Sequence, residues 1–96
     1  MTAGFLVTTT SRFDRELKKL AAKHRELPEV FRHVIQILKA DPYNRSRQHP
    51  IKKLEGISAG DGQYRVRSGR FRFRYDVHSQ TVFLKACSLR REDSYR

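Results

Sequence analysis

The strongest constraint on this chain is a strict alternation of apolar and basic residues over residues 63–75, QYRVRSGRFRFRY. Apolar side chains stand at Tyr64, Val66, Phe71, Phe73 and Tyr75, and arginines stand at Arg65, Arg67, Arg70, Arg72 and Arg74. Successive side chains of a β-strand point to opposite faces, so a hairpin of this sequence has one apolar face and one cationic face.

The turn of this hairpin decides which arginines meet. A two-residue loop at Ser68 and Gly69 is expected to connect the strands. In that register the facing pairs are Arg67 with Arg70 and Arg65 with Arg72. Like charges directly opposite one another destabilise a sheet by about 0.2–1 kcal/mol per pair. Because folding alone gains nothing from this arrangement, either carboxylates elsewhere in the chain or a polyanion must neutralise the row.

The charge balance favours an external partner. The chain has 96 residues, with 21 Lys and Arg against 10 Asp and Glu, for a net charge of +11. Its own carboxylates therefore cannot pair with even half of its cations. Such a surplus points to nucleic acid, or to an acidic protein that covers the basic surface.

Other classes of protein are not indicated. There is no N-terminal basic segment followed by an apolar run, and no stretch of about eighteen apolar residues, so a cytoplasmic protein without a membrane partner is expected. Cys87 is the only cysteine, and it lies in an apolar run that favours a buried thiol. The four histidines have no ligand spacing, so neither a metal nor another cofactor is expected.

The first half of the chain predicts a strand and two helices. Residues 4–9 are β-branched and aromatic enough for a strand. Thr10 or Ser11 can cap a helix with apolar residues at helical spacing, which is expected to end near residues 26–27, before Pro28. A second helix is expected to end near residues 41–42, forming a helical hairpin with the first.

The second half predicts antiparallel strands. Residues 43–48 form a loop, IKKLEG is a short piece, and ISAGDG marks a turn. The arginine hairpin follows, then a tight turn at residues 78–80 and a last strand, TVFLKACS. The expected fold is a single α+β domain over residues 1–96, with an N-terminal strand, a two-helix hairpin and a three-stranded antiparallel sheet. The helices are the natural cover for the aromatic face, which turns the arginines outward.

The cationic residues suit phosphodiester chemistry better than any other motif in the chain. Carboxylates occur singly, and no nucleotide-binding glycine loop or hydrolase elbow is present. Guanidinium groups can stabilise the charge that develops when an RNA 2′-hydroxyl attacks the adjacent phosphate, and this requires no metal. Arginine is a poor general base, and Lys52, His78, Glu92 and Tyr95 all remain candidates for proton transfer.

Plainer interpretations also fit these residues. The basic strands can bind phosphate backbones without catalysis. Tyr95 can stack on a base or simply pack. Arg74 and Asp76 can form an ordinary surface ion pair.

The order of these segments resembles the RelE/ParE superfamily of toxins from toxin-antitoxin systems. The resemblance rests on LEG, a glycine-rich turn, QYRVRSGRFRFRYDV, an apolar strand and the terminal LRREDSYR, with LKADP ending the second helix. It implies a RelE-like, metal-independent endoribonuclease that cleaves messenger RNA on the ribosome, inhibits translation and is held inactive by a cognate antitoxin. The ParE branch, whose members poison DNA gyrase, is the alternative within the same fold.

The resemblance also implies roles for individual residues. Arg65 and Arg67 match the two basic strand residues of the family, and Arg72 matches the phosphate-stabilising arginine of the next strand. Tyr95 matches the C-terminal tyrosine that stacks on the substrate base, and Arg90 matches the terminal arginine, with Arg91 as second choice. The His and Glu pair of the YoeB-like branch is not matched. The remaining basic residues are expected to bind RNA: Lys52, Lys53, Arg70, Arg74 and Arg91.

Overall fold

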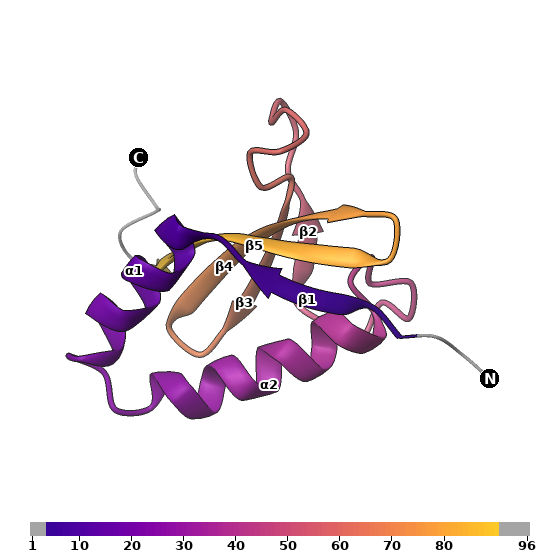
Figure 1. Cartoon of the computed structure of the whole chain (residues 1–96). Helices are drawn as coiled ribbons and strands as arrows, with labels where there is room; N and C mark the ends of the chain where they lie inside the picture. Colours follow the sequence, from indigo (N-terminus) through magenta and orange to yellow (C-terminus); the bar gives the residue numbers. More distant parts are fainter. Residues whose placement is uncertain (1–3, 91–96) are drawn as a thin grey trace.

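In the computed structural model, which describes residues 4–90, two helices pack against one face of a five-stranded sheet (Figure 1). The elements in chain order are β1 (Leu6–Thr9), α1 (Ser11–Ala21), α2 (Leu27–Ala40), β2 (Ile51–Lys53), β3 (Tyr64–Ser68), β4 (Phe71–His78) and β5 (Thr81–Leu89). Within this described part, no helix is long and apolar enough to cross a membrane.

The sheet is mixed, with strand order β1-β5-β4-β3-β2. The first strand pairs parallel to β5, and the other neighbours pair antiparallel. The predicted α+β class and the three antiparallel strands are confirmed. The short IKKLEG piece contributes a further edge strand, β2, which pairs with β3.

The first helix starts where the sequence predicts and ends earlier. Thr10 is its N-cap, because the hydroxyl Oγ1 accepts a hydrogen bond of 3.2 Å from the amide of Phe13. The expected end near residues 26–27 is wrong, since α1 stops at Ala21. The apolar stripe ends at Leu20 and Ala21, so further turns of helix would bury nothing against the sheet. Residues 22–26 instead connect to α2.

The second helix begins one residue before Pro28, which stands in its first turn, and ends at Ala40 as expected. Asp41 then organises the following loop, because its carboxylate accepts hydrogen bonds from the amides of Arg45 and Ser46 and from the Ser46 hydroxyl. These bonds hold the pKa of Asp41 below its usual value, with the Ser46 hydroxyl bond contributing most.

The arginine hairpin forms, but its predicted register is wrong by two residues. The loop consists of Gly69 and Arg70, not Ser68 and Gly69. Gly69 has φ of 59°, as the first position of a primed two-residue turn requires. The facing pairs are therefore Arg65 with Arg74 and Arg67 with Arg72. A shift of two residues leaves every side chain on its predicted face, so the separation into apolar and cationic faces is confirmed.

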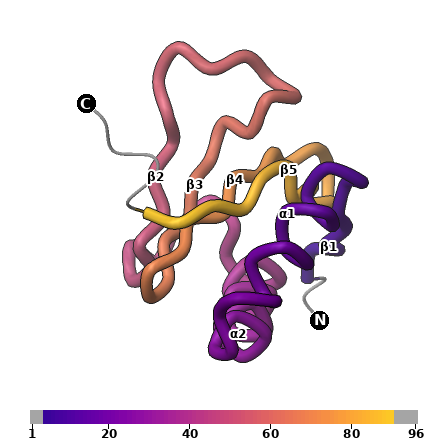
Figure 2. The backbone as a smooth tube through the Cα atoms, turned by 90° about the vertical axis from the view of Figure 1, so that its left-hand side faces the viewer, coloured from indigo at the N-terminus to yellow at the C-terminus, as the bar shows by residue number. Residues whose placement is uncertain are grey.

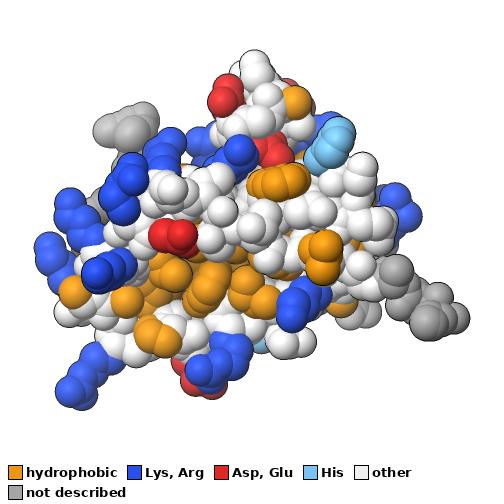
Figure 3. Space-filling view, viewed as in Figure 1, with side chains coloured by type: hydrophobic (Ala, Val, Ile, Leu, Met, Phe, Trp, Pro, Cys, Tyr) orange, Lys and Arg blue, Asp and Glu red, His pale blue; other side chains and the backbone are white. Residues whose placement is uncertain are grey.

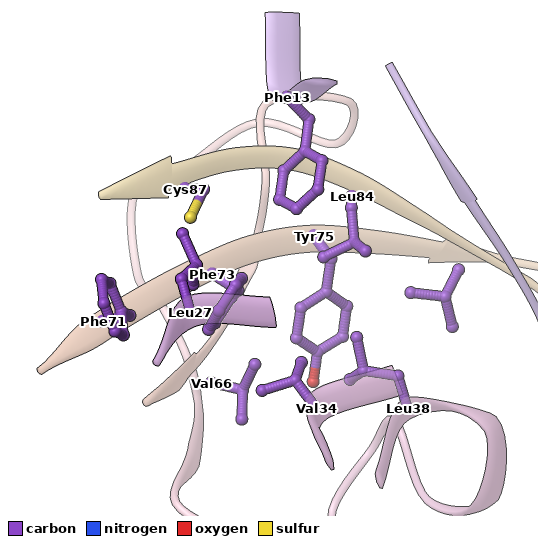
Figure 4. Close-up of a cluster of buried hydrophobic side chains, with 11 residues drawn as sticks. Phe13, Leu27, Val34, Leu38, Val66, Phe71, Phe73, Tyr75, Leu84 and Cys87 are labelled. Atoms are coloured by element: carbon purple, nitrogen blue, oxygen red, sulfur yellow. The ribbon is translucent and has the colours of Figure 1, made fainter. Parts of the chain in front are cut away.

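The core lies between the apolar face of the sheet and the two helices (Figure 4). Phe71, Phe73 and Tyr75 of β4 have no exposed surface, and neither does Phe13 of α1. The rings of Phe13 and Phe73 lie 6.4 Å apart, centroid to centroid. Cys87 is also buried, as predicted, and burial raises the pKa of its thiol to about 12. This packing determines which face of the hairpin remains outside.

Tyr75 ties the core to the end of α2, because its buried hydroxyl donates a hydrogen bond of 2.7 Å to the carbonyl of Pro42. We expect Tyr75→Phe to lower the free energy of unfolding by about 1–3 kcal/mol, since it leaves a buried acceptor unsatisfied. Urea denaturation measures this change. Tyr43→Phe is the matched control, because the Tyr43 side chain is partly exposed and removal of its hydroxyl should have little effect. Equal losses in the two variants would contradict this role for the Tyr75 hydroxyl.

Candidate nucleic-acid interface

Five basic side chains gather on the face of the sheet that the helices leave uncovered. Lys52, Arg65 and Arg74 are successive partners across β2, β3 and β4, and Arg67 and Arg72 are partners across β3 and β4. Directly paired residues lie on the same face, about 4.8 Å from strand to strand, and the two rows are about 7 Å apart along the strands. We call this surface the arginine face, defined by Lys52, Arg65, Arg67, Arg72 and Arg74.

No described element covers the arginine face from above. Both helices lie on the opposite side of the sheet (Figures 1 and 2). The four arginines are partly exposed, and Lys52 is exposed. The Nε atoms of Arg65 and Arg72 are buried, so neighbouring side chains hold these two arginines in place. Guanidinium forks that are positioned in advance suit binding of phosphates. The prediction that the arginines face outward is confirmed.

Arg74, one of the arginines of this face, also has a structural role. Arg74 donates hydrogen bonds from Nη2 to the carbonyls of Asp61 and Gly62, at 2.9 and 3.0 Å, and from Nε to Gly62 at 3.2 Å. The buried carboxylate of Asp76 accepts bonds from the amides of Gly62 and Gln63 at 2.9 and 3.0 Å. The two side chains thus clamp the connection between β2 and β3. The surface ion pair between Arg74 and Asp76 that the sequence suggested does not form, because each side chain binds the backbone of this connection instead.

The clamped segment, residues 54–63, projects beyond the sheet (Figures 1 and 2). Gly62 has φ of 82°, and a Cβ atom there would stand 3.1 Å from Cβ of Arg74. Both the backbone conformation and the close approach therefore require glycine at this position. We call this segment the projecting loop.

Two residues predicted to bind RNA lie away from the arginine face. Lys53 is on the other side of β2, with Nζ 5.8 Å from the centroid of the Tyr64 ring. Arg70 lies in the hairpin turn, and its Nε is 3.4 Å from a carboxylate oxygen of Glu26. The structure therefore does not bring these two cations together with the others.

Arg90 lies next to the hairpin turn. Its amide donates a hydrogen bond of 2.8 Å to the carbonyl of Arg70, and its Nη1 is 3.4 Å from the carbonyl of Gly69. This position is at the end of the sheet nearest the row of Arg67 and Arg72. Arg91 and Tyr95, also predicted as site residues, lie outside the described residues.

Lys85 is a basic residue beside the arginine face that the sequence reasoning did not single out. Arg74 pairs with Ala86 of β5, but the next residue, Tyr75, pairs with Leu84, so Lys85 has no partner on β4. This β-bulge turns both Lys85 and Ala86 away from the core. The signal in the sequence is the spacing of the buried residues Leu84 and Cys87, which are three apart where strict alternation allows only an even separation.

Helix α1 secures this bulge. The amide of Cys87 donates a hydrogen bond of 2.9 Å to Oε1 of Glu16, and Nε of Arg12 donates one of 3.0 Å to Oε2 of the same carboxylate. A helix side chain thus satisfies a strand amide beside the bulge. This bond fixes the edge of the arginine face relative to α1.

On the opposite side of the molecule, an apolar groove of about 580 Å³ runs between α1 and α2 (Figure 3). Leu17, Phe31 and Ile35 line it, and basic residues stand along it, including Lys18 and Arg32. We call this cavity the helix groove. Its apolar lining distinguishes it from the arginine face.

Solved structures of other proteins share this fold. A RelE–RelB complex from Pyrococcus horikoshii OT3 is 25% identical over 91% of this chain and 96% of the matched chain, with a TM-score of 0.63. The RelBE2 complex from Mycobacterium tuberculosis is 22% identical over 91% and 99%, with a TM-score of 0.57. A RelB–RelE complex from Methanococcus jannaschii is 16% identical over 88% and 91%, with a TM-score of 0.56.

No protein-family model and no curated protein sequence matches the chain. The structural neighbours nevertheless confirm the resemblance predicted from the sequence, because the chain has the fold of RelE. All three neighbours are toxin-antitoxin complexes, and this similarity supports a toxin as the class of protein.

The clamp by Asp76 can be tested directly. We expect Asp76→Ala to lower the free energy of unfolding by about 1–3 kcal/mol, because two amides lose a buried acceptor. Hydrogen exchange should accelerate at Gly62 and Gln63 more than in the strands. Asp61→Ala is the matched control, since its carboxylate is in the same loop and the residue is exposed. Unchanged exchange at both amides would show that the clamp does not hold the loop.

Proposed function

We propose that this protein is a RelE-type toxin that cleaves messenger RNA in the cytoplasm without a metal ion, acting on ribosome-bound message and inhibiting translation. The observation that carries the proposal is the arginine face, a dense and outward-facing set of guanidinium groups on a fold shared with RelE–RelB complexes. The ribosome and messenger RNA are the proposed substrate partners, and a cognate antitoxin is the proposed inhibitor.

The proposed reaction is attack by an RNA 2′-hydroxyl on its own 3′-phosphate. The 2′-oxygen loses its proton and bonds to phosphorus, and the 5′-oxygen of the next nucleotide leaves and gains a proton. Negative charge increases on the phosphoryl oxygens in the transition state. Arg65, Arg67 and Arg72, which lie on adjacent strands, are proposed to bind these oxygens through their planar N–H forks.

The C-terminal residues complete the proposed site. Arg90 is close enough to the hairpin turn to assist at the Arg67 and Arg72 end of the face. Arg91 is the second choice for this role. Tyr95 is proposed to hold the target nucleotide by stacking and to take part in proton transfer.

Substitution of Arg72 tests the catalytic role. We expect Arg72→Ala to lower cleavage of ribosome-bound message by about 10²–10³-fold, the usual cost of losing one donor to a developing oxyanion. Arg72→Lys keeps the charge and loses the planar fork, so its rate should fall between those of wild type and Arg72→Ala. The rate is measured by primer extension on a defined message, and RNA affinity is measured separately on the same variants.

The same assay distinguishes the two alternatives. A non-catalytic RNA-binding module would leave the message intact with every variant, wild type included. A ParE-type protein would inhibit supercoiling by DNA gyrase and leave the message intact. Either result with folded wild-type protein would overturn the ribonuclease proposal.

The helix groove is the surface we propose for the antitoxin. Its apolar lining fits the apolar face of an amphipathic helix, and Lys18 and Arg32 at its edge complement acidic residues on that helix. The solved neighbours are complexes of RelE with RelB, which supports an antitoxin as the partner. This groove lies on the opposite side of the sheet from the arginine face.

A charge reversal tests this surface. We expect Lys18→Glu to weaken binding of the cognate antitoxin by about tenfold or more, because like charges would meet across the interface. Lys19→Glu is the matched control, since Lys19 is the next residue of α1, is exposed and does not line the groove. Calorimetry with each variant measures the change. Equal weakening by both variants would indicate a general charge effect and no specific contact at the groove.

A further inference from the structure

A second cavity, of about 540 Å³, adjoins the Arg74 end of the arginine face. Its walls come from three parts of the chain: the start of α1 with Thr10 and Arg12, the projecting loop at residues 56–61, and the bulged edge of the sheet with Arg74, Lys85 and Ala86. Its volume lies within the range of ligand pockets in proteins, about 300–1,000 Å³. Because Arg74 belongs both to the arginine face and to this wall, the two surfaces are continuous.

The shape of this cavity follows from two irregularities already described. The β-bulge turns Lys85 and Ala86 away from the core, and the small side chain of Ala86 beside Arg74 leaves the floor open. The clamp by Arg74 and Asp76 holds the projecting loop as the opposite wall. A regular strand in place of the bulge would not direct both Lys85 and Ala86 to this side.

The charge of the cavity favours an anionic ligand. Three cations line it, Arg12, Arg74 and Lys85, against one carboxylate, Asp61. The guanidinium of Arg12 is occupied by Glu16, and that of Arg74 by the loop carbonyls. Among residues 4–90, Lys85 forms no ion pair, and its ammonium lies 6.0 Å from the ring centroid of Phe83. Lys85 is therefore the cation that is available to a phosphate.

The wall formed by the projecting loop is open to close approach. Gly56 and Gly60 have φ of 76° and 97°, and a Cβ atom built on either would meet nothing within 4 Å. Close packing against a neighbouring residue is therefore not the reason for glycine at these two positions. They leave backbone groups beside the cavity without side chains in front of them, which suits contact with a polar ligand.

We propose that this cavity is a subsite for one nucleotide of the RNA, next to the nucleotides bound on the arginine face, with Lys85 contacting its phosphate. The inference rests on the proposed function and adds a binding position outside the arginine rows. It predicts that RNA is bound along the sheet from the end near Arg67 and Arg72, past Arg74, and into the cavity between the projecting loop and α1.

The test uses single-stranded 2′-O-methyl RNA, which cannot be cleaved, in a series in which each member is one nucleotide longer. Affinity of the free toxin is measured by fluorescence anisotropy at several salt concentrations. For wild type, affinity should rise sharply at the length at which the added nucleotide reaches the cavity. We call this rise the step in affinity. Lys85→Gln should lack this step, bind shorter members normally, and reduce the slope of log affinity against log salt by about one for longer members.

Two further variants make the outcome specific. Ala86→Leu fills the floor without changing charge, so it should remove the step and keep the affinity for short members. Lys18→Gln removes one charge in the helix groove and should retain the step. Thermal unfolding of each variant verifies that it is folded.

The inference is overturned if Lys85→Gln keeps the step, or if it weakens all lengths equally, since that would reflect overall charge. The proposed function fails in a different way. In that case wild-type toxin leaves ribosome-bound message intact in the primer-extension assay. If the step in affinity is absent while wild type cleaves the message and Arg72→Ala does not, only the subsite is rejected.

Discussion

Burial of the aromatic row of β4 against the helices is the constraint on which the rest of the structure depends. Because side chains alternate along a strand, placing Phe71, Phe73 and Tyr75 in the core places Arg72 and Arg74 on the other face. Each buried aromatic side chain contributes about 1.5–3 kcal/mol, whereas each pair of facing arginines costs about 0.2–1 kcal/mol. Burial therefore outweighs repulsion, and the sheet can hold a row of like charges that would not assemble by itself.

The arginines of this face are not equivalent. Arg74 is bound to backbone carbonyls of the projecting loop, so its position is set by the protein and its loss would disturb a wall of the neighbouring cavity. Arg67 has no such bond to the loop and lies in the row closer to the hairpin turn and to Arg90. Arg74 therefore shapes the surface as well as adding charge to it, whereas Arg67 is not bound to the projecting loop.

The spacing of apolar residues and the amino-acid composition were sufficient to predict the class of fold, the presence of the two helices and the separation of the hairpin into an apolar and a cationic face. They could not predict the register of the hairpin, because Ser68–Gly69 and Gly69–Arg70 are both two-residue loops and a shift of two preserves the alternation. The choice depends on the positive φ of Gly69 and on which aromatic pairs meet across the strands. The alternation of apolar and basic residues along the chain specifies neither the φ of Gly69 nor the cross-strand pairs.

The other differences have the same origin in contacts between distant residues. Pairing of β1 with β5 and of β2 with β3 joins segments separated by loops or helices. Asp76 follows Arg74 by two residues in a strand, which suggests an ion pair, yet its carboxylate is bound to amides of the projecting loop. The bulge at Lys85 was visible in the spacing of Leu84 and Cys87, but its consequence, a cavity beside the face, required the loop and α1 as well.

The chemistry of the arginine face also limits what it can do alone. Guanidinium groups stay protonated at neutral pH, so they donate hydrogen bonds to a phosphate and cannot accept the proton of the attacking 2′-hydroxyl. In the proposed reaction these arginines supply electrostatic stabilisation, and the proton must go to another group: water, the substrate, or a residue beyond the arginines. Under the proposed function, a site of this kind would bind RNA but cleave it slowly until the substrate is positioned for in-line attack. Positioning by the ribosome would supply that alignment, which is why dependence on the ribosome is consistent with a face so rich in arginine.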